Sequence, residues 1–184
     1  MTTSKEGLLM ELDSAVRADT EFARRSDDYL SRALGLAFYI LGDAHEAEDA
    51  TQEAMARAWR ARRSLRSIES FDAWVDRIVV NACRERMRHR RSIREVGLPR
   101  ESEFEPEAMD RFGALLARDS VGRALGALTV DQRAVVVLRY WRDLSLEQIA
   151  ERLGWPLGTV KSRLHYGLAA LRERIERDES EVLR

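Results

Sequence analysis

The chain has 184 residues, 45% of them hydrophobic, so it is long enough to bury an apolar core in one or two small domains. Its one cysteine excludes an internal disulfide, and residues 1–14 lack the basic segment and apolar run of a signal peptide. No stretch approaches the roughly 20 apolar residues that cross a bilayer. These features predict a soluble, cytoplasmic protein with no membrane insertion.

Turn-forming residues are scarce, with ten glycines and three prolines, and the chain is rich in good helix formers. This composition predicts an all-α fold. The net charge of −1 conceals a segregation of charge, because residues 57–94 hold 12 basic and 4 acidic side chains whereas residues 1–56 hold 5 and 12. Since neutralising phosphates drives non-specific binding to nucleic acid, the basic block is a candidate DNA surface.

The first predicted helices run from about residue 28 to 41 and from about 44 to 62, with Gly42 and Asp43 between them. The second has an alanine-rich apolar face. Its opposite side carries acidic and amide side chains, namely Glu46, Asp49, Gln52 and Glu53. One face is therefore expected to pack while the other stays free for a partner. Residues 63–70 contain three serines and are expected to form a loop.

A third helix is predicted from about residue 71 to 91, with two distinct stripes. Its core face consists of Phe71, Trp74, Val75, Ile78 and Ala82. A polar stripe about 130° away by helical geometry consists of Arg77, Asn81, Arg84, Arg88 and Arg91. Arginine and asparagine suit phosphates and base edges, and the absence of acidic residues from the stripe argues against a merely solvated face.

Residues 92–113 differ in composition from the helices on either side. They contain two prolines, Pro99 and Pro106, and a run of four closely spaced glutamates, Glu101, Glu103, Glu105 and Glu107. Such a composition favours an extended acidic linker over a packed element. The apolar positions that follow predict a second compact unit of four helices.

The segment 143–166 has the pattern of a helix-turn-helix. Ser145 and Gln148 can form a capping box, Gly154 supplies a left-handed stop, and Pro156 suits the first turn of the next helix. The predicted buried stripe of that helix is Val160, Leu164, Leu168 and Leu171, which leaves Lys161, Ser162, His165 and Tyr166 outward, where a recognition helix meets base edges. An ordinary helical hairpin shares the capping and the periodicity.

These motifs together resemble the ECF (extracytoplasmic function) sigma factors of bacterial RNA polymerase. The segments similar to sigma region two are Leu41–Asp43, Ala47–Glu53, Ala58–Trp59 and Phe71–Asn81. The segment Leu128–Leu171, which includes Gly158–Leu164, is similar to sigma region four. Two unrelated motifs in the right order, with an acidic linker between them, are far more specific than either alone.

The resemblance implies a transcription initiation subunit that is not an enzyme and works at the nucleoid. Its expected partners are core RNA polymerase (the clamp helices of the largest subunit and the flap of the second-largest), duplex and melted promoter DNA, and an anti-sigma factor. The clamp would bind Asp49, Gln52 and Glu53. Melted minus-ten DNA would bind Arg77, Asn81, Arg84 and Arg88, together with the loop before them. The minus-thirty-five duplex would bind Thr159, Lys161, Ser162, Arg163, His165 and Tyr166.

The expected organisation is two small helical domains joined by the acidic linker. Residues 28–94 form sigma region two, 95–113 the linker and 114–177 sigma region four, with 178–184 as a tail. Residues 1–27 are an extension outside the resemblance that could form an extra helix, stay disordered or contact a partner. Ala50 and Thr51 stand where family members usually carry a larger aliphatic residue, which puts the packing beneath the clamp-binding face in question.

Other functions find less support in the sequence. His45, His89, His165 and Cys83 make no spacing typical of a metal site, Cys83 is expected to be a small buried thiol, and no cofactor is implied. No catalytic constellation accompanies the helices, so a helical enzyme lacks a site. The alternative is a one-component helix-turn-helix regulator with an N-terminal ligand-sensing domain, which leaves the acidic face and the arginine stripe unexplained.

Overall fold

A computed structural model describes residues 3–65, 67–96 and 120–182, and every regular element in those ranges is helical. This confirms the predicted all-α class. Helices α1 (Thr3–Leu41), α2 (Ala44–Ala61) and α3 (Phe71–Val96) form the N-terminal unit, with 3₁₀ turns at Arg62–Ser64 and Ile68–Ser70. Helices α5 (Ser120–Gly126), α6 (Val130–Tyr140), α7 (Leu146–Leu153) and α8 (Leu157–Val182) form the C-terminal unit. The glutamates of the predicted acidic linker lie outside the described residues.

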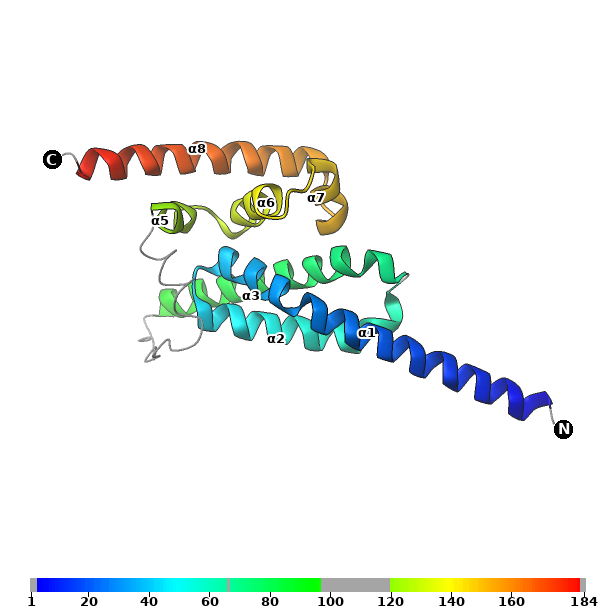
Figure 1. Cartoon of the computed structure of the whole chain (residues 1–184). Coiled ribbons are helices and arrows are strands. Elements are labelled where there is room, and N and C mark those ends of the chain that lie inside the picture. The colour runs from blue at the N-terminus through cyan, green and yellow to red at the C-terminus, as the bar shows by residue number, and fades with distance from the viewer. Residues whose placement is uncertain (1–2, 66, 97–119, 183–184) are drawn as a thin grey trace.

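Helix α1 is much longer than the predicted helix at 28–41. It is continuous over 39 residues, and its first part extends beyond α2 and α3 (Figure 1). Leu9, Leu12 and Val16 are between 55% and 63% exposed there, and Phe22 is the first buried apolar side chain among those of the helix that the structure describes. The extension is thus an extra helical segment in direct continuation of α1, and its apolar stripe is not covered by this chain.

Small residues allow α2 to pack closely against its neighbours. Ala47, Ala50, Ala54 and Ala58 are completely buried. Thr51 is buried beside them, and its hydroxyl donates to the Ala47 carbonyl at 2.7 Å, so the polar atom is satisfied inside the core. Ala50 and Thr51 therefore complete the packing without the larger aliphatic residues that are usual at these positions.

The helix-turn-helix forms as the local signals predict. The Ser145 hydroxyl accepts from the Gln148 backbone amide and the Gln148 side chain accepts from the Ser145 amide, which closes the capping box. Gly154 then ends α7 with a positive φ of 67°, a left-handed conformation that glycine adopts without strain. Two consecutive amides of α8, those of Thr159 and Val160, donate to the Pro156 carbonyl.

One position of the predicted α8 stripe is wrong. Val160 is fully buried and Leu164 packs on the core, but Leu168 is 37% exposed. The adjacent Gly167 is buried instead, because α8 crosses α6 there, and a Cβ at Gly167 would lie 3.2 Å from a methyl carbon of Val136. The close crossing turns the following side chain towards solvent.

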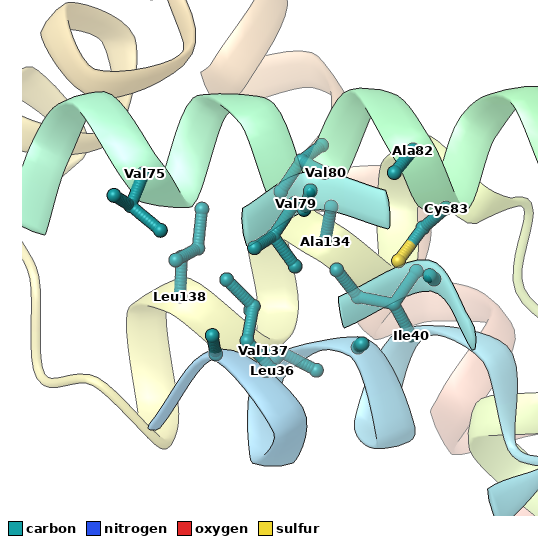
Figure 2. Packing of buried hydrophobic residues seen from close by; sticks show 14 of the residues in the cluster. Leu36, Ile40, Val75, Val79, Val80, Ala82, Cys83, Ala134, Val137 and Leu138 are labelled. Carbon is teal, nitrogen blue, oxygen red and sulfur yellow. The ribbon is translucent and has the colours of Figure 1, made fainter. Parts of the chain in front are cut away.

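The two units share one apolar core. Leu138 and Val137 of α6 reach between Leu36 of α1 and Val75 of α3 (Figure 2). The segment Val135–Leu138 of α6 is buried all round, as expected for a helix enclosed by neighbours on every side. The arrangement buries the core face of α3 more widely than its sequence predicts, since Val79 and Val80 are also fully buried.

Cys83 is a buried thiol, as predicted. It is fully buried in the shared core near Ile40 (Figure 2), and burial raises the pKa of its thiol to about 12. In the part of the chain that the structure describes, no group of three or more His, Cys, Asp or Glu side chains is arranged to hold a metal ion. No helix in the same part is long and apolar enough to span a bilayer.

Candidate polymerase-binding and DNA-binding surfaces

The acidic face of α2 lies opposite its buried alanines, but basic side chains already contact it. Asp49 pairs with Arg86 of α3 at 3.1 Å, and Glu53 pairs with Arg57 at 2.6 Å. Arg57 also donates to Glu85, which lowers the pKa of that carboxyl. The prediction that this face is free is therefore only partly correct, because two of its carboxylates carry intramolecular ion pairs.

These ion pairs can be exchanged for contacts with a partner at little cost. The side chains of Asp49 and Glu53 remain 40% and 43% exposed, and Gln52 is exposed between them. Exposed ion pairs contribute only about 0–1 kcal/mol, because water competes for both charges. A basic surface that brings several well-placed cations can therefore displace them.

The C-terminal unit contacts two residues of the arginine stripe of α3, Arg77 and Arg84. Arg77 donates from Nε to the Arg152 carbonyl and from Nη2 to the Glu151 carbonyl, both at 2.7 Å. Its guanidinium thus caps the last turn of α7, where unpaired carbonyls and the helix dipole favour a cation. The guanidinium lies over Gly154, where a Cβ would be 3.4 Å from Cζ.

Arg84 takes part in a second contact between the units. Its Nε lies 2.9 Å from Oδ1 of Asp131 on α6, and the same carboxylate binds Arg163 of α8. Trp155 lies beside both guanidinium groups, 5.4 Å from Arg84 and 4.8 Å from Arg163 by ring centroid. Asp131 and Trp155 therefore join one predicted minus-ten residue to one predicted minus-thirty-five residue.

The remaining residues of the stripe face outward. Asn81 and Arg88 are exposed, whereas the side chain of Arg91 lies outside the described part of the chain. Arg77 and Arg84 thus contact the C-terminal unit, although Arg77 remains exposed, whereas Asn81 and Arg88 face solvent.

Asp76 is the residue that the sequence analysis missed. It is completely buried on α3, and its carboxylate accepts from the Tyr29 hydroxyl at 2.6 Å. Two arginines of the C-terminal unit complete the site, Arg142 at 3.0 Å and Arg152 at 2.6 Å. Burial, reinforced by the charge of Asp76, raises the pKa of Tyr29, so the phenol stays protonated and donates. The only signal in the sequence is an isolated acid beside the core face.

Arg133 forms a further polar contact between the units. It is 5% exposed and donates from Nη1 to the Ile40 carbonyl at 2.6 Å, near the end of α1. Its Nη2 reaches the carbonyls of Gly126 and Leu128, both at 3.2 Å. Burial lowers the pKa of this guanidinium, but its carbonyl partners compensate much of the cost of the buried charge.

The N-terminal turns of α8 present a different surface. Lys161, Ser162, His165 and Tyr166 are exposed, whereas Thr159 is half-buried. The Ser162 hydroxyl donates to the Thr159 carbonyl at 3.0 Å, and the rings of His165 and Tyr166 meet edge to face with centroids 5.3 Å apart. Of the six predicted minus-thirty-five residues, Arg163 forms an ion pair, with Asp131 of α6 in its own unit, and the other five lie at the predicted end of the helix.

Two family models match the chain. Residues 26–93 match Sigma-70 region 2, and residues 124–173 match Sigma-70, region 4. The ECF RNA polymerase sigma factor SigW of Bacillus subtilis is 33% identical over 165 residues, which cover 84% of this chain and 88% of SigW. SigL of Mycobacterium tuberculosis is 35% identical over 148 residues, which cover 79% of this chain and 84% of SigL.

The chain belongs to the ECF RNA polymerase sigma factors. It spans 61% of the length of another relative, SigE of Mycolicibacterium smegmatis, with 35% identity. Sigma factors are non-catalytic transcription initiation factors, so the family assignment does not favour the ligand-sensing regulator. It accounts for both the N-terminal unit and the helix-turn-helix.

Solved structures of sigma factors resemble this one over both units. A co-crystal structure of RpoE with the anti-sigma factor NepR from Bartonella quintana has a TM-score of 0.66 and 27% identity, covering 84% of this chain and 96% of that chain. A structure of CnrH in complex with the cytosolic domain of CnrY has a TM-score of 0.60 and 25% identity, covering 89% and 96%. Each superposition is longer than either region, so it includes residues of both.

Proposed function

We propose that this sigma factor binds core RNA polymerase through the exposed acidic face of α2 and directs it to promoters. The observation that carries the proposal is the pair of exposed carboxylates of Asp49 and Glu53, held only by ion pairs that a partner can exchange. The partner surface would be the basic clamp helices of the largest subunit. The C-terminal unit would bind the flap of the second-largest subunit.

The two DNA elements would be bound by different helices. On α3, Asn81 and Arg88 are exposed and can contact melted minus-ten DNA at once, whereas Arg77 and Arg84 already bind groups of the C-terminal unit. The exposed end of α8 would read the minus-thirty-five duplex in the major groove. Base edges and faces that melting exposes suit the polar and guanidinium groups of α3.

Three further features of the proposal rest on the relatives and the predicted boundaries. RpoE was solved with an anti-sigma factor and CnrH with the cytosolic domain of CnrY, which supports an anti-sigma partner and a cytoplasmic location for this chain. The family matches at 26–93 and 124–173 support a region-two domain at 28–94 and a region-four domain at 114–177. Residues 95–113 would serve as the linker between them.

Charge reversal on α2 tests the polymerase site. Asp49→Arg with Glu53→Arg should weaken binding to purified core enzyme by at least roughly a hundredfold, because like charges at a basic partner surface cost several kcal/mol. Fluorescence anisotropy of labelled sigma factor titrated with core enzyme measures the affinity.

The matched control reverses two exposed carboxylates of α8, Glu173→Arg with Glu176→Arg, which lie away from α2 and from the outward residues at the start of α8. Its core affinity should equal that of the native chain. A charge-reversed α2 variant with native circular dichroism and undiminished core affinity would show that α2 is not the polymerase site. A ligand-sensing regulator would fail to bind core enzyme at all.

A further inference from the structure

The N-terminal part of α1, which precedes the Sigma-70 region 2 match at residue 26, contacts the connection between α2 and α3 (Figure 1). From residue 9 to residue 21 of α1, Asp19 is the one residue that is half-buried, and the others are exposed. Its carboxylate accepts from Nε of Arg62 at 2.6 Å and from Nη2 at 2.9 Å. The two residues are 43 positions apart in sequence, so this bidentate pair ties α1 to the start of the connection.

Arg62 makes further contacts that fix its orientation. Its Nη1 donates to the Trp59 carbonyl at 3.0 Å, and its guanidinium lies 4.3 Å from the centroid of the Trp59 ring. The Leu65 amide donates to the Arg62 carbonyl at 3.1 Å, which closes a 3₁₀ turn. The hydrogen bond from Arg62 lowers the pKa of the Asp19 carboxyl, so the carboxylate stays charged. Since a guanidinium fork is planar and rigid, these contacts together hold the turn in one orientation.

Phe22, about one turn further along α1, contacts the helices on both sides of the same connection. It is 4% exposed, and its ring meets that of Trp59 near the end of α2 with centroids 5.8 Å apart. At the start of α3 it meets Phe71 at 5.3 Å and Trp74 at 6.2 Å. All three contacts are edge to face, a favoured geometry for aromatic pairs. Phe22 therefore sets how far apart the two ends of the connection lie.

The connection, residues 62–70, presents polar groups to solvent between these supports. Leu65 and Ile68 pack on the core, whereas Arg63 and Ser67 are exposed. Its two 3₁₀ turns are each three residues long. Such short turns have poor hydrogen-bond geometry of their own, so their shape depends on the contacts that hold their ends.

We propose that Asp19 is a positioning residue for promoter recognition, which acts through Arg62 to hold residues 62–70 in the shape that contacts melted minus-ten DNA. The inference rests on the proposed minus-ten site, which the family resemblance extends to this loop. Groups that discriminate between bases must be held closely in place, so the side chains that support them affect specificity without touching DNA. The N-terminal part of α1 thereby contributes to promoter choice from outside the matched region.

Two other roles of the pair lead to different results. If Arg62 were a phosphate ligand that Asp19 occupies, removing the carboxylate would raise affinity for DNA of every sequence. If the pair served folding alone, its loss would lower the stability of the chain and leave base preference unchanged. A positioning role instead changes the preference for particular bases while the chain remains folded.

Two variants break the pair from its two sides. Asp19→Ala removes the carboxylate, and Arg62→Lys keeps the positive charge but loses the planar fork and its bidentate geometry. The matched control is Asp13→Ala, which removes the same charge from the same helix. Asp13 is exposed and pairs at 2.7 Å with Arg17 of α1 itself, so its loss leaves the connection untouched. All variants are made in the full-length chain.

The first readout is the mobility of the loop in the free protein. Hydrogen exchange of the Leu65 amide, followed by NMR, reports the turn that Arg62 closes. Asp19→Ala and Arg62→Lys should each speed this exchange by at least about threefold, because the turn opens more readily, and Asp13→Ala should not. Unchanged exchange in both variants of the pair would overturn the support of the loop by α1.

The second readout is base preference of the holoenzyme, measured by selection from a promoter library randomised in the minus-ten element. Asp19→Ala and Arg62→Lys should lower discrimination at the same one or two positions by at least about threefold, and the double variant should lower it no further, because the two residues act as one unit. The preference at the minus-thirty-five element and the affinity for core enzyme should stay native. A uniform gain in affinity would show that Arg62 binds phosphate and would overturn the positioning role.

A third variant distinguishes failure of this inference from failure of the proposed site. Arg63→Ala with Ser67→Ala changes the exposed surface of the loop and leaves Asp19 and Arg62 in place. If it alters minus-ten preference and Asp19→Ala does not, the loop recognises DNA and the positioning role is overturned. If neither variant alters preference, the loop is not part of the minus-ten site, and the role of Asp19 in recognition is overturned with it. Altered preference at shared positions supports both.

Discussion

The two candidate DNA-binding surfaces differ in how the chain itself treats them. On α3, Arg77 and Arg84 are engaged by the C-terminal unit, through the carbonyls that end α7 and the carboxylate of Asp131. On α8, Lys161 and Tyr166 lie exposed at the start of the helix. Both surfaces show the residue types expected for contacts with nucleic acid. The C-terminal unit contacts part of the α3 surface, whereas Lys161 and Tyr166 of the α8 surface are exposed.

The difference shows what a polar stripe on a predicted helix can establish. It identifies which side chains share a face, because that follows from 3.6-residue periodicity. It does not identify what the face contacts, because a guanidinium binds a helix terminus, a carboxylate or a phosphate with the same donors. For α3 the first of these contacts comes from 74 and 75 residues further along the chain.

The largest effect should come from breaking the apolar contact that joins the C-terminal unit to the core face of α3. Leu138 is fully buried, so Leu138→Ala should lower the free energy of unfolding by about 2–5 kcal/mol through lost burial and the cavity left behind. Urea denaturation followed by circular dichroism measures this. Leu168→Ala is the control: it removes the same atoms at a 37% exposed site and should lower the free energy of unfolding by about 1 kcal/mol, clearly less than Leu138→Ala. Equal losses at the two sites would contradict the difference in burial between Leu138 and Leu168.

The local features of the fold could be predicted because their signals are local. The capping box of Ser145 and Gln148 and the left-handed Gly154 each depend on residues within one turn, and all three have the expected conformation. The stop at Gly42, with a φ of 70°, belongs to the same class. Periodicity likewise identified the alanines that α2 buries.

Features that depend on distant residues could not be predicted. Asp76 is bonded to residues 66 and 76 positions away, and no pattern within α3 encodes those partners. Leu168 fits the i, i+4 spacing of its helix but lies exposed, because the crossing at Gly167 rather than the spacing decides the buried face. The sequence leaves three alternatives open for residues 1–27, and the described part of that segment is helical, yet nothing in its apolar spacing says whether this chain covers the apolar face.

A smaller effect is expected at the open surface. Lys161→Ala should weaken binding of the holoenzyme to duplex promoter DNA by about 1.5 kcal/mol, roughly tenfold, because a charge-assisted hydrogen bond is lost. If Lys161 contacts a phosphate, the loss of affinity will be similar for all DNA sequences. The slope of log affinity against log salt concentration will then fall by about one. If it reads a base, the loss will concentrate at one position of the minus-thirty-five element.

The control for this comparison lies on the same helix. Arg172→Ala removes an exposed cation about three turns further along α8. Its effect on duplex affinity should be small, because a recognition helix contacts base edges with its N-terminal residues. Filter binding at several salt concentrations distinguishes the two variants, and an equal loss at both positions would show that α8 attracts DNA only through its net charge.

The smallest effect separates folding from recognition within the helix-turn-helix itself, through two serines that differ in role. The Ser145 hydroxyl caps α7, so Ser145→Ala should lower the free energy of unfolding by about 1 kcal/mol, the usual cost of a lost N-cap. Exposed Ser162 bonds only to the Thr159 carbonyl of its own helix, so Ser162→Ala should change stability by less than about 0.5 kcal/mol. If the exposed end of α8 reads DNA, promoter preference should change in the Ser162 variant and stay native in the Ser145 variant, measured by selection from a randomised minus-thirty-five library. A changed preference in the Ser145 variant alone would mean that the fold of α7, and not the outward face of α8, sets the sequence that is read.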